Sequence, residues 1–139
     1  MIVGLGCMRI ADEAVLTAAE GLTLLDTADA YGDAAHDNER LVARALAGRP
    51  RPEIATKVGL VRPEGRWEND GRARHLVASA EESAAILGGI DLLQLHAVDP
   101  RVPLATSVRA LAGLVRDGVA RALGVCNLTV PQQIGIAHV

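Results

Sequence analysis

The feature that most limits the fold of this chain is a repeated alternation of short apolar runs with longer segments of helical spacing. Five runs have the length and aliphatic composition of buried strands, at residues 2–5, 22–25, 54–56, 92–95 and 120–125. Four intervening segments repeat apolar residues every three or four positions, at 12–20, 38–47, 74–87 and 104–117. This alternation predicts βα units and an α/β fold in which helices cover a parallel sheet.

The ends of the expected helices carry the residues that favour such ends. A glycine stands just past each of the four segments, where a left-handed residue commonly terminates a helix: Gly21, Gly48, Gly88 and Gly118. Near the end of the chain, Thr129 is followed three residues later by Gln132, which is the pattern of a capping box. We therefore expect a fifth helix to begin at Thr129.

Polar residues at the strand ends distinguish between two α/β architectures. Four of them follow successive strands at intervals of 31, 39 and 31 residues: Asp26, Lys57, His96 and Asn127. In a (β/α)8 barrel the carboxyl ends of all strands meet at one mouth, whereas a doubly wound sheet gathers its site mainly at one switch point. The spacing favours a partial TIM (β/α)8 barrel of about five βα units.

A doubly wound nucleotide-binding fragment is the alternative fold. Gly4 and Gly6, followed by Asp26 twenty residues later, imitate a dinucleotide-binding fingerprint. The third glycine of that fingerprint is replaced by Arg9, and the fingerprint leaves the later polar residues without a role. The partial barrel therefore remains the favoured fold.

Length and charge limit the number of domains and the classes of partner. The chain has 139 residues, and we expect a single domain over residues 1–139. Its net charge is −3, with acidic and basic residues interspersed, so we expect neither a nucleic-acid partner nor a membrane partner. Two cysteines without clustered ligands predict neither a disulfide scaffold nor a metal site. With no secretory leader recognised, we expect a cytoplasmic location.

Two of the residue types that occur only once, lysine and tyrosine, fall into one constellation. Lys57 is the single lysine and Tyr31 the single tyrosine, and Tyr31 follows Asp26 by five residues. An ammonium beside a phenol stabilises the phenolate, and a nearby carboxylate keeps the ammonium charged, so such a tyrosine can donate a proton near neutral pH. His96 at the next strand end could orient a substrate carbonyl. The simpler interpretation is that Asp26 caps a turn and Tyr31 packs in a loop.

Four stretches of this sequence resemble the aldo-keto reductase family. Residues 24–32 (LLDTADAYG) resemble its Asp/Tyr signature, 55–59 (ATKVG) its lysine strand, and 90–96 (IDLLQLH) its histidine strand. Residues 118–127 resemble a later segment of the family, with Cys126 where serine is usual. The resemblance follows the family order over almost the whole chain.

This resemblance implies a catalytic tetrad and a reaction. The tetrad would be Asp26, Tyr31, Lys57 and His96, with Tyr31 as the proton donor, Lys57 and Asp26 tuning it, and His96 placing the carbonyl. The hydride would come from NADPH, and the substrate would be a small aldehyde or ketone that is reduced to an alcohol.

The resemblance also implies a set of cofactor contacts. Asn127 would bind the nicotinamide carboxamide, with Cys126 and Asp26 beside it. The turn that contains Cys7 and Met8 would touch the cofactor ribose through its backbone. Because a thiol is a poorer hydrogen-bond partner than a hydroxyl, Cys126 is expected to weaken one polar contact.

Two further groups have open interpretations. His36, Asn38 and Glu39 precede and open the second helical segment, where a solvated cap is expected and a substrate-loop role is the alternative. Trp67 lies in the loop after the third strand, where it would either contact substrate or anchor the loop.

The number of expected strands raises an alternative for function. A family barrel has eight strands, whereas this sequence predicts about five. The alternative to an enzyme is therefore a truncated, catalytically inactive remnant or interaction module that lacks the C-terminal cofactor-binding half. A five-stranded arc also leaves open edges, through which self-association is expected.

Overall fold

A five-stranded parallel sheet organises the chain in a computed structural model that describes residues 3–18 and 21–137. The strands of this sheet are β1 (Gly4–Gly6), β2 (Leu24–Asp26), β3 (Glu53–Val58), β6 (Ile90–Leu95) and β7 (Ala120–Val125). The helices are α1 (Glu13–Ala18), α2 (Asp37–Ala45), α3 (Ala73–Leu87), α4 (Leu104–Arg116) and α5 (Val130–Gly135). A small antiparallel hairpin, β4 (Leu60–Val61) and β5 (Glu68–Asn69), encloses a 3-10 turn at Pro63–Gly65.

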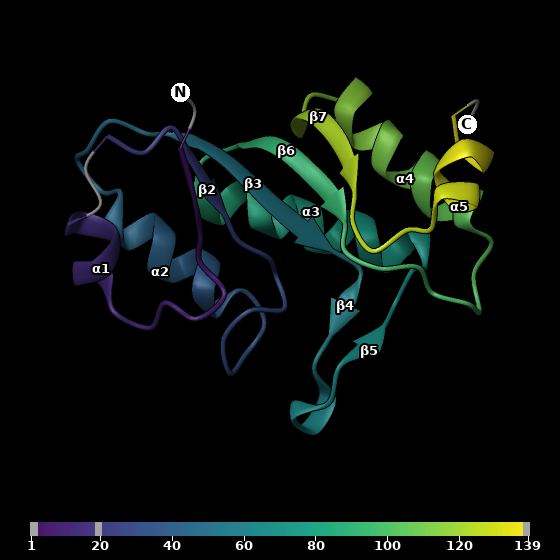
Figure 1. Cartoon of the computed structure of the whole chain (residues 1–139), viewed down its shortest axis with the longest axis horizontal. Coiled ribbons are helices and arrows are strands. Elements are labelled where there is room, and N and C mark those ends of the chain that lie inside the picture. Colours follow the sequence, from purple (N-terminus) through teal and green to yellow (C-terminus); the bar gives the residue numbers. More distant parts are fainter. Residues whose placement is uncertain (1–2, 19–20, 138–139) are drawn as a thin grey trace.

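The strand order confirms the partial barrel. The sheet runs β1-β2-β3-β6-β7, so each strand pairs with its neighbour in the chain and the order never reverses. A doubly wound sheet needs such a reversal, and that alternative is excluded. In Figure 1 the sheet is curved, with α2 and α3 behind it, while its other face is turned to the viewer.

The helices bury one face of this sheet. One apolar cluster joins α3 and α4 to β6 and includes the fully buried Leu76, Leu93 and Leu111. A second cluster joins α1 and α2 to β2 and β3, and includes Val42 and Ile54. Burial of this aliphatic surface is the main source of the stability of the arc.

The opposite face is less covered. By the strand register, Leu24, Leu92 and Ala122 belong to this face. Their side chains are half-buried or exposed. Within the described residues, β1 and β7 each pair along one edge only. Among the described residues, the sheet therefore has one face that no helix packs against, called the uncovered face below, and two free edges.

The expected elements match the structure with small shifts at their ends. The strand expected at 120–125 matches β7, while β3 and β6 begin earlier than expected and β2 ends at Asp26. The four terminating glycines have positive φ, and Thr129 and Gln132 form the expected capping box. Residues 2, 19 and 20 of the expected elements lie outside the described residues.

The hairpin β4–β5 was not expected from the sequence. Its strands have two residues each, which is too short to show an alternating apolar pattern. No helix in the described part of the chain is long and apolar enough to cross a membrane.

Candidate active site

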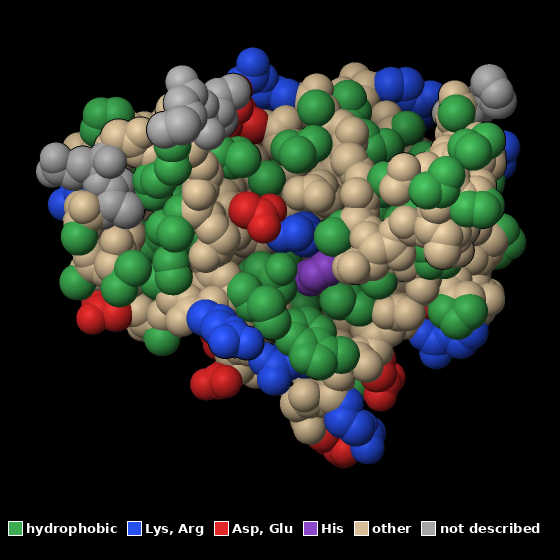
Figure 2. Space-filling model, in the orientation of Figure 1, with side chains coloured by type: hydrophobic (Ala, Val, Ile, Leu, Met, Phe, Trp, Pro, Cys, Tyr) green, Lys and Arg blue, Asp and Glu red, His purple; other side chains and the backbone are tan. Residues whose placement is uncertain are grey.

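The four polar residues expected at the strand ends lie at the same end of the sheet. Asp26 ends β2, Lys57 lies one residue before the end of β3, His96 directly follows β6, and Asn127 lies two residues after β7. Parallel strands bring these ends together. Figure 2 shows an acidic, a basic and a histidine side chain next to one another in the middle of the face turned to the viewer.

The Lys57 ammonium is held by three acceptors. Its Nζ lies 2.8 Å from both carboxylate oxygens of Asp26 and donates to the carbonyl of Thr27, also at 2.8 Å. The Lys57 side chain is 6% exposed and the Asp26 side chain 38% exposed. Three acceptors match the three hydrogens of an ammonium, so the charge pair is fixed without a ligand.

Tyr31 lies close to both Lys57 and His96. The Lys57 Nζ is 5.1 Å from the centroid of the Tyr31 ring, and the His96 ring meets the Tyr31 ring edge to face with centroids 5.5 Å apart. Tyr31 is buried. The structure thus brings together the residues of the proposed tetrad, with the cation beside the phenol ring.

His96 is electrically neutral at physiological pH. Its burial, followed by the nearby charge of Lys57, lowers the pKa of His96 from 6.5 to about 4, although the charge of Asp26 opposes this shift. Its backbone N–H donates to the carbonyl of Val58, which extends the sheet pairing by one residue. A neutral imidazole can donate one hydrogen bond to a carbonyl oxygen without competing as an acid.

Asn127 is exposed and adopts a left-handed backbone conformation, with φ of 57°. Its side-chain amide donates to the His96 carbonyl at 2.9 Å and lies 3.4 Å from the Cys126 sulfur. Asn127 therefore joins the end of β7 to that of β6. Its side-chain oxygen makes no hydrogen bond within the described chain.

The turn after β1 divides into a buried residue and an exposed one. Cys7 is fully buried, its N–H donates to the carbonyl of Asp26, and its own carbonyl accepts from Ile10 and Asn38. Burial and the charge of Asp26 raise the pKa of the Cys7 thiol to about 11. Met8, in contrast, is 52% exposed. Of the two residues, Met8 is the one available to a ligand.

The expectation of a solvated cap at His36, Asn38 and Glu39 is wrong. All three residues are buried. Asn38 accepts a hydrogen bond from the Thr27 hydroxyl and donates to the carbonyls of Cys7 and Ile10. The local pattern is that of a polar helix start, but α2 begins beneath the loop that carries Tyr31, so these polar groups bind other parts of the chain.

Two further residues are placed by the structure. Trp67 stacks against the guanidinium of Arg62, with 4.7 Å between the guanidinium carbon and the ring centroid. Arg62 in turn donates to the carbonyl of Gly32, so it connects the indole to the Tyr31 loop. Trp67 is 45% exposed. Gln94 lies beside the site, with its amide 3.5 Å from an Asp26 oxygen. Its signal in the sequence is a polar residue inside the apolar run at residues 92–95.

Comparison with known proteins gives a family match over most of the chain. The family model described as "Aldo/keto reductase family" matches residues 9–138. A 6-dehydroglucose reductase of Agrobacterium fabrum is 35% identical over 121 residues, which cover 78% of this chain and 40% of that protein. An uncharacterized oxidoreductase of Schizosaccharomyces pombe is 36% identical over 112 residues, covering 78% of this chain and 36% of that protein.

Solved structures agree with the family match. An aldo-keto reductase from Bacillus halodurans superposes with a TM-score of 0.77 at 29% identity, covering 99% of this chain and 50% of that one. The glycerol dehydrogenase of Gluconobacter oxydans gives a TM-score of 0.79 at 32% identity, covering 96% and 46%. The chain thus spans less than half the length of these curated relatives and about half the length of these structures.

Proposed function

The chain belongs to the aldo/keto reductase family, a family of oxidoreductases, and we propose that its site carries out the NADPH-dependent reduction of an aldehyde or ketone to an alcohol. The observation that carries the proposal is the Tyr31 ring, whose centroid lies 5.1 Å from the Lys57 ammonium and 5.5 Å from the centroid of the neutral His96 imidazole. The three side chains come from different strand ends and form one group at the mouth of the arc.

Tyr31 is the proton donor in this proposal. As the carbonyl carbon gains a hydride, its oxygen gains negative charge and takes the phenol proton, which leaves a phenolate on Tyr31. The Lys57 ammonium stabilises that phenolate, and Asp26 holds the ammonium in place through two contacts of 2.8 Å. The reduction is reversible, because Tyr31 can take the proton back from an alcohol.

His96 orients the carbonyl. A neutral imidazole donates one hydrogen bond to the carbonyl oxygen and leaves proton transfer to Tyr31. The lowered pKa of His96, about 4, supports this division of roles above that pH.

The exposed residues around the site fit a nicotinamide cofactor, which supplies the hydride when bound. Among the described residues the side-chain oxygen of Asn127 has no partner, and we assign it as the acceptor for the carboxamide of the nicotinamide. A side-chain atom added at Gly6 would meet no neighbour within 4 Å, so the surface beside β1 is open. We assign cofactor contact to Asn127, Cys126, Asp26 and Met8, and to Cys7 only through the turn that it holds.

Carbonyl compounds with neighbouring hydroxyl groups form the first substrate panel. The names of two similar proteins, a 6-dehydroglucose reductase and a glycerol dehydrogenase, motivate this choice. Glyceraldehyde and dihydroxyacetone represent the class, and an aromatic aldehyde without hydroxyl groups serves as the comparison.

A second copy of the chain is the macromolecular partner that we propose. The uncovered face of the sheet and the free edges of β1 and β7 support self-association, since unpaired strand edges and exposed apolar surface favour pairing.

The central test compares the wild-type chain with Tyr31→Phe. NADPH consumption is followed by absorbance with each carbonyl compound, and NADPH binding by calorimetry. Loss of the phenol proton is expected to lower turnover about 10²- to 10⁴-fold while NADPH affinity stays within a few-fold. Undiminished turnover of Tyr31→Phe would remove Tyr31 from the reaction.

A further inference from the structure

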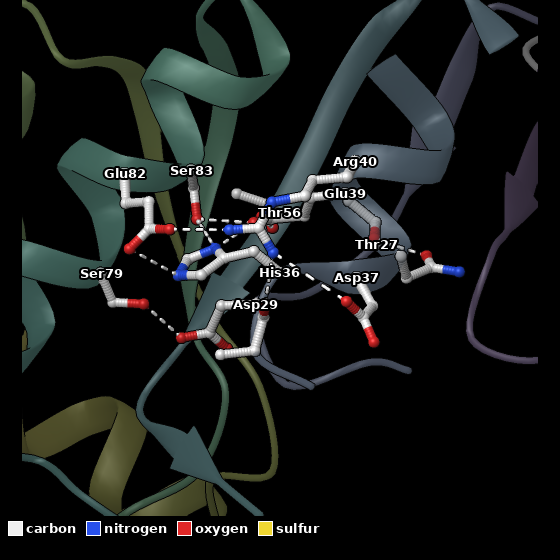
Figure 3. Close-up of polar contacts among 12 residues, drawn as sticks. Thr27, Asp29, His36, Asp37, Glu39, Arg40, Thr56, Ser79, Glu82 and Ser83 are labelled. Carbon is white, nitrogen blue, oxygen red and sulfur yellow. Dashed lines mark hydrogen bonds and ion pairs between the residues drawn. The ribbon is translucent and has the colours of Figure 1, made fainter. Parts of the chain in front are cut away.

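A buried carboxylate, that of Glu39, takes part in the cluster of polar contacts drawn in Figure 3. The Glu39 side chain is fully buried, and it accepts hydrogen bonds from Thr56 at 2.5 Å and Ser83 at 3.0 Å. Its second oxygen lies 2.5 Å from Nδ1 of His36. The three partners come from β3, from α3 and from the loop before α2, so one carboxylate joins three parts of the chain.

Glu39 and His36 form a close polar pair, with a carboxylate oxygen of Glu39 2.5 Å from Nδ1 of His36. Burial lowers the pKa of His36, but the hydrogen bond and the charge of Glu39, with the charges of Glu82 and Asp29, raise it more, and the net shift is upward. A buried carboxylate is costly unless it is paired and hydrogen-bonded, and Glu39 has three partners. These contacts favour one arrangement of the Glu39 and His36 side chains, so the pair holds the segments that it connects in fixed positions.

The Thr56 bond holds the strand that carries Lys57. Successive side chains of a strand point to opposite faces, so Thr56 points toward the helices and Lys57 toward the uncovered face. Glu39 thus fixes β3 from behind, at the residue next to Lys57.

The His36 bond holds the loop that carries Tyr31. The His36 N–H donates to the carbonyl of Asp29 at 2.6 Å, and the Asp29 N–H donates to the carbonyl of Lys57 at 3.1 Å. In the next turn, the Asn38 N–H donates to the carbonyl of Tyr31 at 3.1 Å. The backbone on either side of Tyr31 is therefore tied to the segment that Glu39 anchors.

Packing alone does not fix the outer side of this loop. A cavity of about 590 Å³ borders it, with Asp29, Ala30, Gly32 and His36 in its wall. Since close packing is reduced on that side, where Arg62 donates to the carbonyl of Gly32, hydrogen bonds carry more of the positioning.

We propose that Glu39, through Thr56 and His36, is a positioning residue that sets the distance and orientation of the Tyr31 ring relative to Lys57. The proposal rests on the proposed function of Tyr31. Because Glu39 is fully buried, we expect its effect to fall on the proton-transfer step and not on binding. A small displacement of a reacting group can change a rate strongly.

Paired variants at Thr56 test this directly. Thr56→Val keeps the shape and removes the hydroxyl that binds Glu39, and Thr56→Ser restores the hydroxyl. We expect Thr56→Val to lower kcat ten- to a hundredfold with KM and NADPH affinity within about threefold, and Thr56→Ser to return kcat to within about threefold of wild type. Glu39→Gln, which is nearly isosteric, is expected to lower kcat in the same way.

The control removes a comparable hydroxyl elsewhere. Ser107 is also buried and donates to the carbonyl of Gly71 at 2.7 Å, away from the Tyr31 loop. Ser107→Ala is expected to lose stability without a change in kcat, measured at a temperature where circular dichroism shows every variant folded. Equal kcat values for Thr56→Val and wild type would overturn the proposal, as would equal losses in Thr56→Val and Ser107→Ala.

Hydrogen exchange separates this proposal from the proposed function. If the wild-type chain shows no turnover, the proposed function fails, and the positioning claim is judged by amide exchange across residues 27–38. Thr56→Val, or Glu39→Gln if the former does not fold, is expected to speed exchange in this segment at least tenfold, and Ser107→Ala is expected to leave it unchanged. Unchanged exchange in the Glu39 and Thr56 variants would overturn the positioning claim on its own.

Discussion

Single residues at this site differ sharply in how firmly they are held. Lys57 has an acceptor for each of its ammonium hydrogens, and Asp26 remains partly exposed beside it. His96 has an Nδ1 atom that is buried and has no partner within the described residues. The charge pair is therefore fixed by hydrogen bonds, whereas the imidazole is placed by packing against Tyr31 and by its backbone.

Replacement of Asp29 is expected to change how stability depends on pH. Burial, with a contribution from the charge of Glu39, raises the pKa of Asp29 from 3.8 to about 7, although its bond from Ser79 opposes the shift. The protonated form is favoured in the folded state, so the contribution of Asp29 to stability is greatest below pH 4 and is lost as pH rises to about 7. Asp29→Asn should therefore be more stable than wild type at pH 8, by about 2–4 kcal/mol.

Urea unfolding at pH 5 and pH 8 measures this difference. Asp33→Asn is the matched control, because Asp33 is exposed in the same loop, and it should change stability by less than about 0.5 kcal/mol. An Asp29→Asn variant that is less stable than wild type at pH 8 would contradict the assigned shift.

The contribution of His96 to stability is expected to depend on pH in the opposite direction to that of Asp29. Its pKa is lower in the folded chain than in the unfolded chain, so its contribution to stability is complete above pH 6.5 and is lost as pH falls to about 4. The loss is at most about 3 kcal/mol. His96→Asn should remove it, so the variant should lose less stability than wild type between pH 6.5 and 4. Identical profiles in urea unfolding would argue against a buried, neutral imidazole.

At the scale of elements, the sequence predicts the repeating units well and the loops poorly. The strand at 120–125 and the terminating glycines could be predicted because each depends on local sequence. A run of apolar residues indicates the strand, and a glycine tolerates the positive φ at a helix end. The burial of Glu39 does not, because it depends on Thr56 and Ser83, which are 17 and 44 residues away in the sequence. The proximity of Asp26 and Lys57 was predictable because parallel strands place their carboxyl ends together, whereas the position of Tyr31 depends on the loop after β2.

Alanine substitutions at one glycine inside helix α4 and one just after it are expected to change stability in opposite directions. Gly113 lies inside the helix, and an added Cβ would meet only the flexible end of Arg116, at 3.4 Å. Gly113→Ala is expected to stabilise the chain by about 0.5–1 kcal/mol. Gly118 follows the helix with φ of 80°, so Gly118→Ala should destabilise it by about 1 kcal/mol. Thermal unfolding of both variants checks the pair, and a destabilising Gly113→Ala would contradict the packing described here.

At the scale of the whole molecule, the arc covers about half the length of the similar solved structures. Its five strands place the proposed tetrad at one end, but the sheet has an uncovered face and, among the described strands, two edges without a partner. The proposed reaction therefore depends on side chains that internal contacts hold in place, whereas the proposed self-association depends on the exposed face and edges of the sheet.

Self-association through this surface can be measured by sedimentation velocity. We expect the wild-type chain to sediment as a dimer or larger species at concentrations near 100 µM. Ala122 is exposed on β7, on the face away from the helices, so Ala122→Lys should place a charge in the contact and weaken association at least tenfold. A wild-type chain that remains monomeric at this concentration would contradict the expectation.

Deuterium transfer tests the central claim most directly. The wild-type chain is incubated with NADPH dideuterated at C4 of the nicotinamide and with glyceraldehyde, dihydroxyacetone or the aromatic aldehyde, and the alcohol is analysed by mass spectrometry. We predict one deuterium on the former carbonyl carbon with at least one of the three substrates, and a yield that falls at least a hundredfold in Tyr31→Phe. With each of them, the absence of deuterated alcohol, or an equal yield from Tyr31→Phe, would contradict an aldo/keto reductase site that uses Tyr31 as its acid.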